Sequence, residues 1–231
     1  MIMIFFRSLC LASFMLVALQ GAAQTSIIYS ADSLFNLGNQ AYGNEQLDQA
    51  IFFYERAHLL DPHAEDIGIN IQLANENLST DIVEIAPFFL ASWWKSLYTY
   101  LLPGSWKLIS IGFLFLGLVL VYFFNFKENN WSRTIYYSLL SSVLILFILS
   151  ILAGNSRNRQ IFNSPFAIVF GEEQSLYQGP DEISEQVKTI TGGNKLRILD
   201  EVGNWYKVSA MDSEQGWILK NKVQCIAFPE K

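Results

Sequence analysis

Few side chains in this chain of 231 residues could act as catalysts or metal ligands. The two histidines, His58 and His63, have no cysteine or carboxylate beside them at a metal-ligand spacing, and no nucleophile elbow is present. Gly192 and Gly193 fit a turn better than a phosphate cradle. We therefore predict a protein that is not an enzyme and has no cofactor and no metal site, with both histidines at the surface near a helix end.

The two cysteines do not make a disulfide framework. Cys10 lies in an N-terminal segment that we expect to be removed, which leaves Cys225 without a partner. Cys225 is predicted to be a small buried apolar residue rather than a reactive thiol.

Two apolar runs, residues 108–126 and 134–153, determine how the other elements can be placed. Neither run contains a charge, and each has about the 20 residues that a helix needs to cross about 30 Å of hydrocarbon. Backbone groups in lipid must be hydrogen-bonded within the segment, so both runs are predicted to be helices. Residues 127–133 form a short loop, predicted to be cytoplasmic. The chain before and after this hairpin must then face the same side of the membrane.

The interior of the predicted hairpin has no Asp, Glu, Lys, Arg or His, so it offers no proton relay or ion path. Small residues are expected to pack the two helices together, because they let membrane helices approach closely. These residues are Gly112, Gly117, Ser138, Ser141 and Ser142.

Residues 1–23 have the features of a secretory signal peptide. Arg7 precedes an apolar stretch that ends in small residues, and cleavage is expected after Ala23. The segments that flank the hairpin are therefore predicted to be periplasmic.

Residues 24–84 are predicted to form a helical domain of three short antiparallel helices, because apolar residues recur at helical spacing. Asn44 is expected to cap the second helix. Asp61 is expected to cap the third, with Pro62 at its first helical position. The segment has ten acidic residues and only Arg56 as a basic one, which favours a basic or polar partner.

This segment resembles a tetratricopeptide repeat, in which two antiparallel helices touch through small residues. The resemblance is carried by Leu34, Leu37, Gly38, Ala41, Leu47, Ala50, Tyr54, Ala57 and Pro62. It implies a protein-binding role, and a single repeat needs a partner, a second copy or the rest of the chain to cover its core. It also implies that Phe35, Asn39 and Tyr42 line a partner-binding groove. The alternative is that they face the neighbouring helix or solvent.

Residues 85–107 are rich in aromatic side chains and contain Lys95. The apolar part is shorter than a membrane span, and a lysine at its centre would cost about 2.5–3.5 kcal/mol in lipid. The segment is predicted to lie in the membrane interface, with Pro103 and Gly104 breaking it from the next helix. In the alternative, it spans the membrane and places the C-terminal domain in the cytoplasm.

After a linker at 154–163, residues 164–231 alternate in the manner of short strands and predict a small all-β barrel. The sequence from Asn204 to Val208, followed by Gly216 and Trp217, resembles bacterial SH3-like (SH3b) domains. The resemblance makes Tyr177 and Trp205 candidate ligand contacts, whereas Trp217 is expected in the core.

The order of these segments resembles BatE-type proteins of the Bacteroides aerotolerance (Bat) operon. The fold class is then a multi-domain membrane protein with a TPR-like helical hairpin, a two-helix transmembrane hairpin and an SH3-like barrel. The resemblance implies a scaffold in the bacterial inner membrane that joins other Bat proteins, some with von Willebrand type A domains, in an envelope complex linked to stress or oxygen tolerance. The alternative is a cell-wall sensor whose SH3-like domain binds peptidoglycan. The sequence has no stripe of basic residues of the kind that binds nucleic acid. The formation of homo-oligomers is left open.

Overall fold

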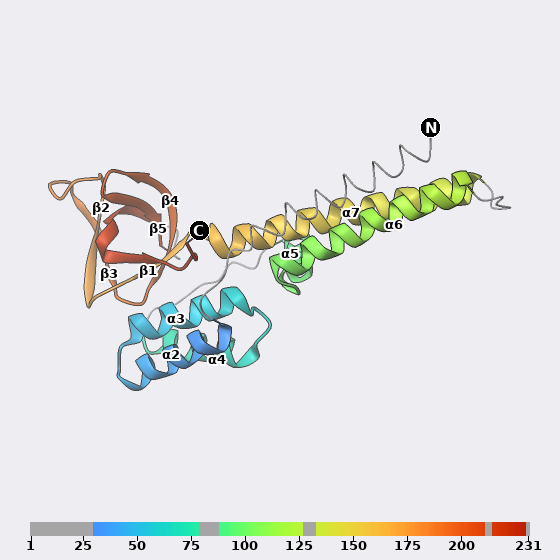
Figure 1. The fold of residues 1–231 in the computed structure, drawn as a ribbon. Coiled ribbons are helices and arrows are strands. Elements are labelled where there is room, and N and C mark those ends of the chain that lie inside the picture. Colours follow the sequence, from blue (N-terminus) through green and yellow to red (C-terminus); the bar gives the residue numbers. More distant parts are fainter. Residues whose placement is uncertain (1–29, 79–87, 127–132, 211–213, 230–231) are drawn as a thin grey trace. The chain divides into compact units, whose positions relative to one another are not determined.

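The computed structural model describes residues 30–78, 88–126, 133–210 and 214–229 (Figure 1). The predicted signal peptide and nearly all of the predicted cytoplasmic loop lie outside these residues. The chain divides into two compact units. We call the described parts of residues 27–100 and 157–230 the helix–barrel unit, and residues 101–156 the two-helix unit.

Three short helices open the helix–barrel unit: α2 (Ala31–Gly43), α3 (Leu47–Leu60) and α4 (Glu65–Glu76). The three-helix prediction for this segment is confirmed, but the two predicted caps are wrong. Asn44 closes the end of α2, where its backbone N–H donates to Gln40 O at 3.1 Å. Asp61 lies in the turn after α3 and accepts a bond from the backbone N–H of His63 at 3.2 Å. The side chain that does cap a helix is Ser30, which accepts from Ser33 N at 3.1 Å.

The helices α2 and α3 approach most closely at Gly38. A Cβ placed there would lie 2.5 Å from Cε1 of Tyr54, so only a glycine allows this packing. Ala50 and Ala57 on α3 are fully buried. The prediction that small residues mark the contact between these two helices is confirmed.

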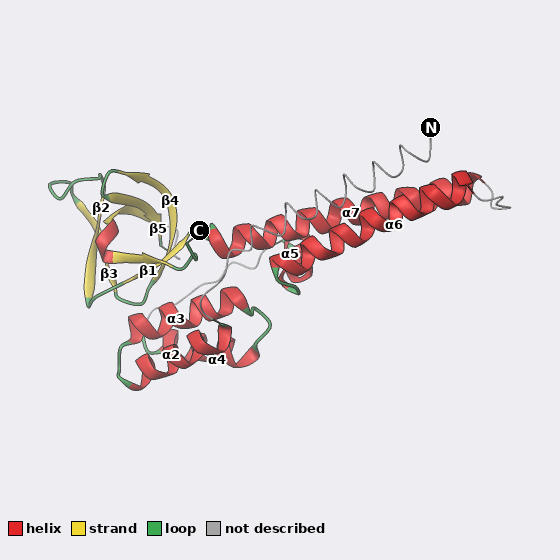
Figure 2. Ribbon diagram, in the orientation of Figure 1, coloured by secondary structure: helices red, strands yellow, loops and turns green. Residues whose placement is uncertain are grey.

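The C-terminal part of the unit is a seven-stranded antiparallel barrel-like sheet (Figure 2). The strand order is β3-β2-β6-β5-β4-β1-β7. The apolar residues of the alternating strands form its core, among them Leu176, Val208 and Ile218. Gly203, with φ +56°, makes the turn that joins β4 to β5. The strands are β1 (Phe166–Val169), β2 (Glu173–Tyr177), β3 (Gln186–Thr191), β4 (Lys195–Val202), β5 (Trp205–Ser209), β6 (Gln215–Leu219) and β7 (Val223–Cys225), with a 3-10 turn at Lys220–Lys222 before β7.

The three helices and the barrel share one hydrophobic core. Apolar residues of α2, α3 and α4 pack in the same cluster as Ile161, Ile168, Ile226 and Phe228. Burial of apolar surface is the main force that holds such elements together. The helical segment therefore covers its core with the C-terminal part of its own chain, which was one of the three possibilities that a single repeat leaves open.

Polar contacts fix the position of α3 on the barrel. Glu55 on α3 and Lys195 on β4 form an ion pair of 2.6 Å, and the Glu55 side chain is only 8% exposed. Asp48 accepts a hydrogen bond from the backbone N–H of Gly171 at 3.1 Å. The buried guanidinium of Arg157 donates to Leu60 O, at the end of α3, at 2.8 Å.

A further short helix, α5 (Phe89–Thr99), belongs to the same unit. It occupies the middle of the segment that was predicted to lie in the membrane interface. Its last turn contacts the α3–α4 turn, where Thr99 Oγ1 and His63 Nε2 are 3.2 Å apart.

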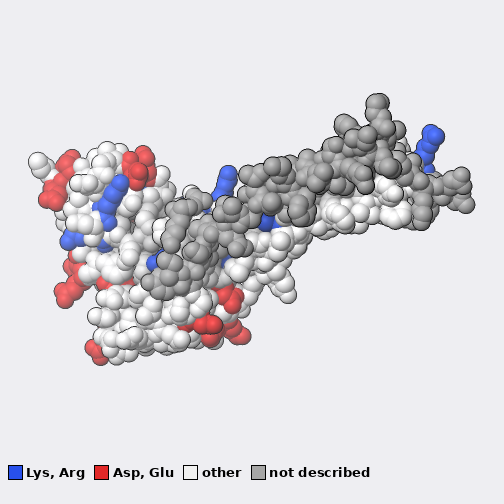
Figure 3. Space-filling model, in the orientation of Figure 1, with Lys and Arg blue, Asp and Glu red and all other residues white. Residues whose placement is uncertain are grey.

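The two-helix unit contains helix α6 (Pro103–Phe126) and most of helix α7 (Arg133–Phe162). Both helices are long and apolar enough to cross a membrane. Few charged side chains show along the described surface of α6 and α7 in Figure 3. Both helices are longer than the predicted spans. The helix α6 begins at Pro103 instead of residue 108, and α7 ends at Phe162 instead of residue 153. The predicted linker at 154–163 is therefore helical for nearly all its length.

The contacts between α6 and α7 differ in part from those expected. Ser138, Ser141 and Ser142 donate to carbonyls of their own helix, because Ser hydroxyls readily bond the preceding turn. The serines that meet across the helices are Ser110 and Ser150, whose buried hydroxyls are 2.8 Å apart.

Of the two glycines expected at this contact, Gly117 packs against Val143, but Gly112 has nothing close to it. Gly154 makes a tighter approach, since a Cβ there would lie 3.1 Å from Cβ of Trp106.

We expect Gly38→Ala to destabilise the helix–barrel unit by about 1–3 kcal/mol, because the new methyl group overlaps the Tyr54 ring. The matched control is Gly68→Ala in α4, where nothing lies within 4 Å. There alanine should stabilise by up to about 1 kcal/mol through its helix propensity. Urea unfolding of the full chain in detergent measures both effects. An equal response of the two variants would contradict the close approach of α2 and α3.

The buried pair of Glu55 and Lys195 should show strong coupling in a double-mutant cycle. We expect Lys195→Met alone to cost about 2 kcal/mol or more, because it leaves a buried carboxylate unpaired. With Glu55→Gln added, the total cost should fall about 1 kcal/mol or more below the sum of the single costs. The exposed pair of Lys220 and Glu201, 3.1 Å apart, is the control and should couple by less than about 1 kcal/mol. Additive costs at the buried pair would rule out the coupling.

Candidate functional site

One candidate site is a polar face that α2 and α4 form together. We call it the amide face, made of Asn39, Tyr42, Asn70 and Asn77. Asn39 Oδ1 accepts from Tyr54 Oη at 2.8 Å and from Asn70 Nδ2 at 2.9 Å. Asn77 Nδ2 donates to Tyr42 Oη at 2.9 Å. Asn39 and Asn77 remain exposed, so their unused donors and acceptors can meet a ligand.

The three predicted groove residues do not share one environment. Phe35 is half-buried and packs on the ring of Tyr54, with centroids 5.8 Å apart. Asn39 and Tyr42 point to the amide face, where both have partners on neighbouring helices. Phe35 therefore packs against Tyr54 and is not one of the exposed residues of this face. A partner contact by Asn39 or Tyr42 stays a prediction.

Tyr54 acts as the donor beneath the amide face. A phenol is protonated at neutral pH, and burial raises the pKa of Tyr54 further above the usual value, so its hydroxyl is a donor here. This proton helps to fix the orientation of the Asn39 amide, whose oxygen accepts from Tyr54 and from Asn70.

The sequence analysis missed Asn70 and Asn77. They lie seven residues apart, which places them two turns apart on one face of α4. Two asparagines at this spacing in a helix could have revealed the face. Their closeness to Asn39 and Tyr42 follows only from the packing of α4 beside α2.

A second candidate site is an outward face of the barrel. Trp217 on β6 lies directly between Tyr177 on β2 and Lys207 on β5 in the strand register. Residues directly opposite in antiparallel strands project to the same side of the sheet. In the next row Trp205 lies opposite Leu219. We call these five residues the aromatic face.

The structure brings the predicted pair Tyr177 and Trp205 together, with ring centroids 5.6 Å apart and an interplanar angle of 86°. Trp205 is buried, at 9% exposure, while Tyr177 is half-buried. The prediction that Trp217 lies in the core is wrong. It is half-buried and outside the barrel core, because the inward positions of β6 belong to Gly216 and Ile218.

The aromatic face is suited to binding rather than to catalysis. Rigid rings supply apolar contact area, and the Lys207 ammonium beside them can meet a carboxylate or a carbonyl oxygen. The strands β2, β6 and β5 hold these side chains through backbone pairing, so little ordering is needed on binding.

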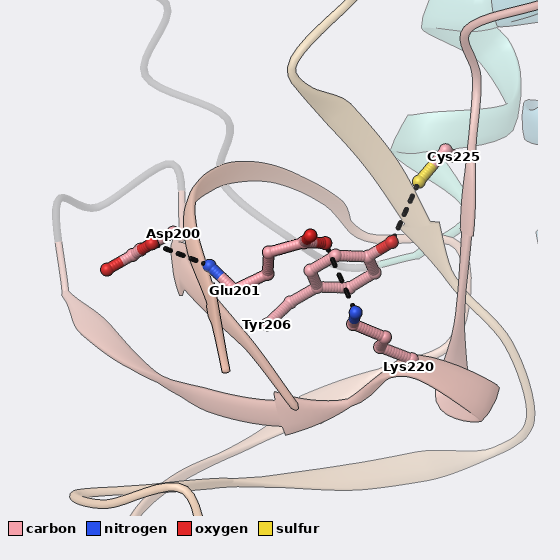
Figure 4. A network of polar contacts seen from close by, with 5 residues as sticks. All are labelled: Asp200, Glu201, Tyr206, Lys220 and Cys225. Carbon is pink, nitrogen blue, oxygen red and sulfur yellow. Dashed lines mark hydrogen bonds and ion pairs between the residues drawn. The ribbon is translucent and has the colours of Figure 1, made fainter. Parts of the chain in front are cut away.

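A smaller polar network joins β4, β5 and β7 (Figure 4). Lys220 Nζ lies 3.1 Å from Glu201 and 4.9 Å from the centre of the Tyr206 ring. Burial raises the pKa of Tyr206, whose hydroxyl accepts from Cys225 Sγ at 3.9 Å. Cys225 is half-buried and packs against the barrel core, which confirms in part its prediction as a small buried apolar residue. This network ties strands together and leaves the aromatic face undisturbed.

The described residues include no group of three or more histidine, cysteine or acidic side chains that could hold a metal ion. His63 is exposed in the α3–α4 turn, as predicted for a surface residue. His58, in the last turn of α3, is half-buried instead. Burial lowers its pKa, against the opposing field of Glu55 and with the added effect of Lys195 and Lys95.

The sheet order and strand lengths define a small antiparallel barrel of the SH3 type. Residues 175–224 match the family described as bacterial SH3 domain, which confirms the predicted SH3b domain. Domains of this family bind proteins or peptidoglycan. No curated protein matches the chain. The matched range includes Tyr177, Trp205 and Trp217, and the resemblance of the N-terminal helices to a tetratricopeptide repeat stays a prediction.

The lowered pKa of His58 predicts acid sensitivity. The folded state binds a proton at His58 less readily than the unfolded chain, so stability falls as the pH drops below about 6.5 toward the folded pKa. Thermal unfolding of the full chain at pH 7.5 and 5.5 should show a larger drop for the native sequence than for His58→Gln. Equal drops in both proteins would show that His58 does not contribute.

Proposed function

We propose that this protein is a membrane-anchored scaffold, in which α6 and α7 hold the helix–barrel unit at one membrane surface. The amide face and the aromatic face would then be docking surfaces for partner proteins. Two docking surfaces on one anchored unit raise the effective concentration of each partner for the other without new contacts.

The observation that carries this proposal is the core shared by segments on either side of α6 and α7. Helices from residues 31–76 and strands from residues 166–225 pack in one cluster. Segments that share a core lie on the same side of a bilayer, so the chain between them crosses an even number of times. Two apolar helices of sufficient length supply two crossings.

The side that the unit occupies is inferred from the N-terminal segment. A signal peptide at residues 1–23 would deliver everything after it to the outer surface of the membrane. Bacterial SH3 domains are typically extracytoplasmic, which agrees with this orientation. We therefore place the helix–barrel unit in the periplasm of a bacterium, anchored in the inner membrane.

The partner class follows from the resemblance to BatE-type proteins. We propose that the partners are other membrane or periplasmic proteins, with Bat proteins that carry von Willebrand type A domains as the first candidates. Several exposed acidic residues of the helical segment, among them Glu45, Glu65 and Asp66, would steer a basic surface toward this segment.

Cross-linking in intact membranes, followed by capture of the full chain, tests this function. A partner captured with the native protein should be lost about tenfold or more with Trp217→Ala, because interface aromatics act as binding hot spots. The control is Ile183→Ala, an exposed position in the loop between β2 and β3, outside the aromatic face. Both variants should keep the native thermal unfolding temperature within a few degrees. Capture that is the same with Trp217→Ala and the native protein would exclude the aromatic face as a docking surface.

The second candidate is a cell-wall sensor, favoured by the peptidoglycan binding found among bacterial SH3 domains. In that case the detergent-solubilised chain should sediment with isolated cell wall, and Trp217→Ala should abolish sedimentation. If the chain sediments with cell wall and the cross-linking captures no protein partner, the sensor function holds and the scaffold function is excluded.

A further inference from the structure

The helix α5 exposes an apolar face that nothing in the described chain covers. Phe89 and Trp93, one helical turn apart, are 68% and 64% exposed. Phe88 and Leu90 at the start of the helix and Tyr100 after its end are also more than half exposed. Aromatic side chains of this size are seldom left in water as a contiguous group, so this face indicates a binding surface.

The other side of α5 is polar and is attached to the helical segment. Ser92, Lys95 and Thr99 recur at intervals of three and four residues, which places them along one stripe. Thr99 is buried, and its hydroxyl lies 3.2 Å from Nε2 of His63. The ring of Tyr100 meets the His63 ring edge-on, at 5.9 Å between centroids. The last turn of α5 is therefore held on the α3–α4 turn.

Length and crossing parity exclude a membrane span for α5. Its 11 residues extend only about 16 Å at 1.5 Å per residue, about half the hydrocarbon thickness. If α5 also spanned the membrane, the chain would cross three times between α2–α4 and the barrel. These segments would then lie on opposite sides, although they share one core. The alternative in which this segment crosses the membrane conflicts with both observations.

Chain connectivity keeps α5 near the start of the first span. Only three residues separate Thr99 from Pro103, where α6 begins. At 3.8 Å for each step between Cα atoms, these four steps reach at most about 15 Å. The C-terminal end of α5 thus lies within about 15 Å of the point at which α6 begins, whatever the orientation of the units.

We propose that the apolar face of α5 lies in the headgroup layer of the phospholipid bilayer, with the helix axis along the membrane surface. This inference rests on the proposed function, because it requires that α6 and α7 span the membrane. A short amphipathic helix with tryptophan and phenylalanine on one side and lysine on the other has the composition of interfacial helices. Through Thr99 and His63, α5 then ties the helical segment to the lipid surface.

Site-directed spin labelling of the full chain in phosphatidylcholine–phosphatidylglycerol vesicles tests the inference. Single cysteines are introduced by Phe89→Cys, Trp93→Cys and Lys95→Cys in a background with Cys10→Ser and Cys225→Ser. Phe115→Cys in α6, an exposed position, reports on the anchor itself. Collision with oxygen marks lipid exposure, and collision with a water-soluble nickel chelate marks water exposure.

We expect the labels at positions 89 and 93 to show shallow lipid exposure, at least threefold higher in the oxygen-to-nickel collision ratio than the label at position 95. The label at position 115 should be deep in lipid. Water exposure of positions 89 and 93, or shielding from both reagents, would overturn the inference while position 115 still confirms the anchor. Water exposure at position 115 would instead overturn the anchored scaffold, and the inference with it.

Discussion

The hydrophobic core that joins the two ends of the chain constrains every other feature of this protein. Ile161, Ile168 and Phe228 bury against helices that precede the two long apolar helices. Neither the three helices nor the barrel has another described element that covers this apolar surface. Each alone would expose it to water. The buried pair of Glu55 and Lys195 adds a directional contact to a core that is otherwise set by shape. One unit therefore forms from segments that are separated by about eighty residues of mostly apolar chain.

This constraint gives the two apolar helices a geometric role. In the proposed scaffold they return the chain to the side from which it came, so that the second half of the core can meet the first. The predicted spans contain no charged side chain, and α6 and α7 meet at the serine pair Ser110 and Ser150. Such a contact suits a membrane anchor better than a proton or ion pathway. The chemistry of the protein then lies in what the helix–barrel unit exposes.

Two exposed surfaces of different character remain on that unit. The amide face offers donors and acceptors that can bind a peptide backbone, and Tyr54 orients it from below. The aromatic face offers rings on a rigid sheet, with Lys207 beside Trp217. A polar surface and an apolar surface on the same support can bind two different partners, which is the physical basis of the scaffold proposal.

The sequence by itself determined the local features. Helical periodicity defined α2, α3 and α4, uncharged apolar length defined α6 and α7, and the tryptophan-containing strands defined the SH3-type barrel, because these signals depend on neighbours along the chain. It failed where an outcome depends on distant partners. Asn44 closes the end of α2 instead of capping α3, which begins after Gln46. Trp217 faces outward because Gly216 and Ile218 take the inward positions of β6. Only the tertiary structure joined Asn39 to Asn70, and Glu55 to Lys195, across 31 and 140 positions of sequence. Contacts over such separations leave no periodic pattern, because they are fixed by the packing of whole elements.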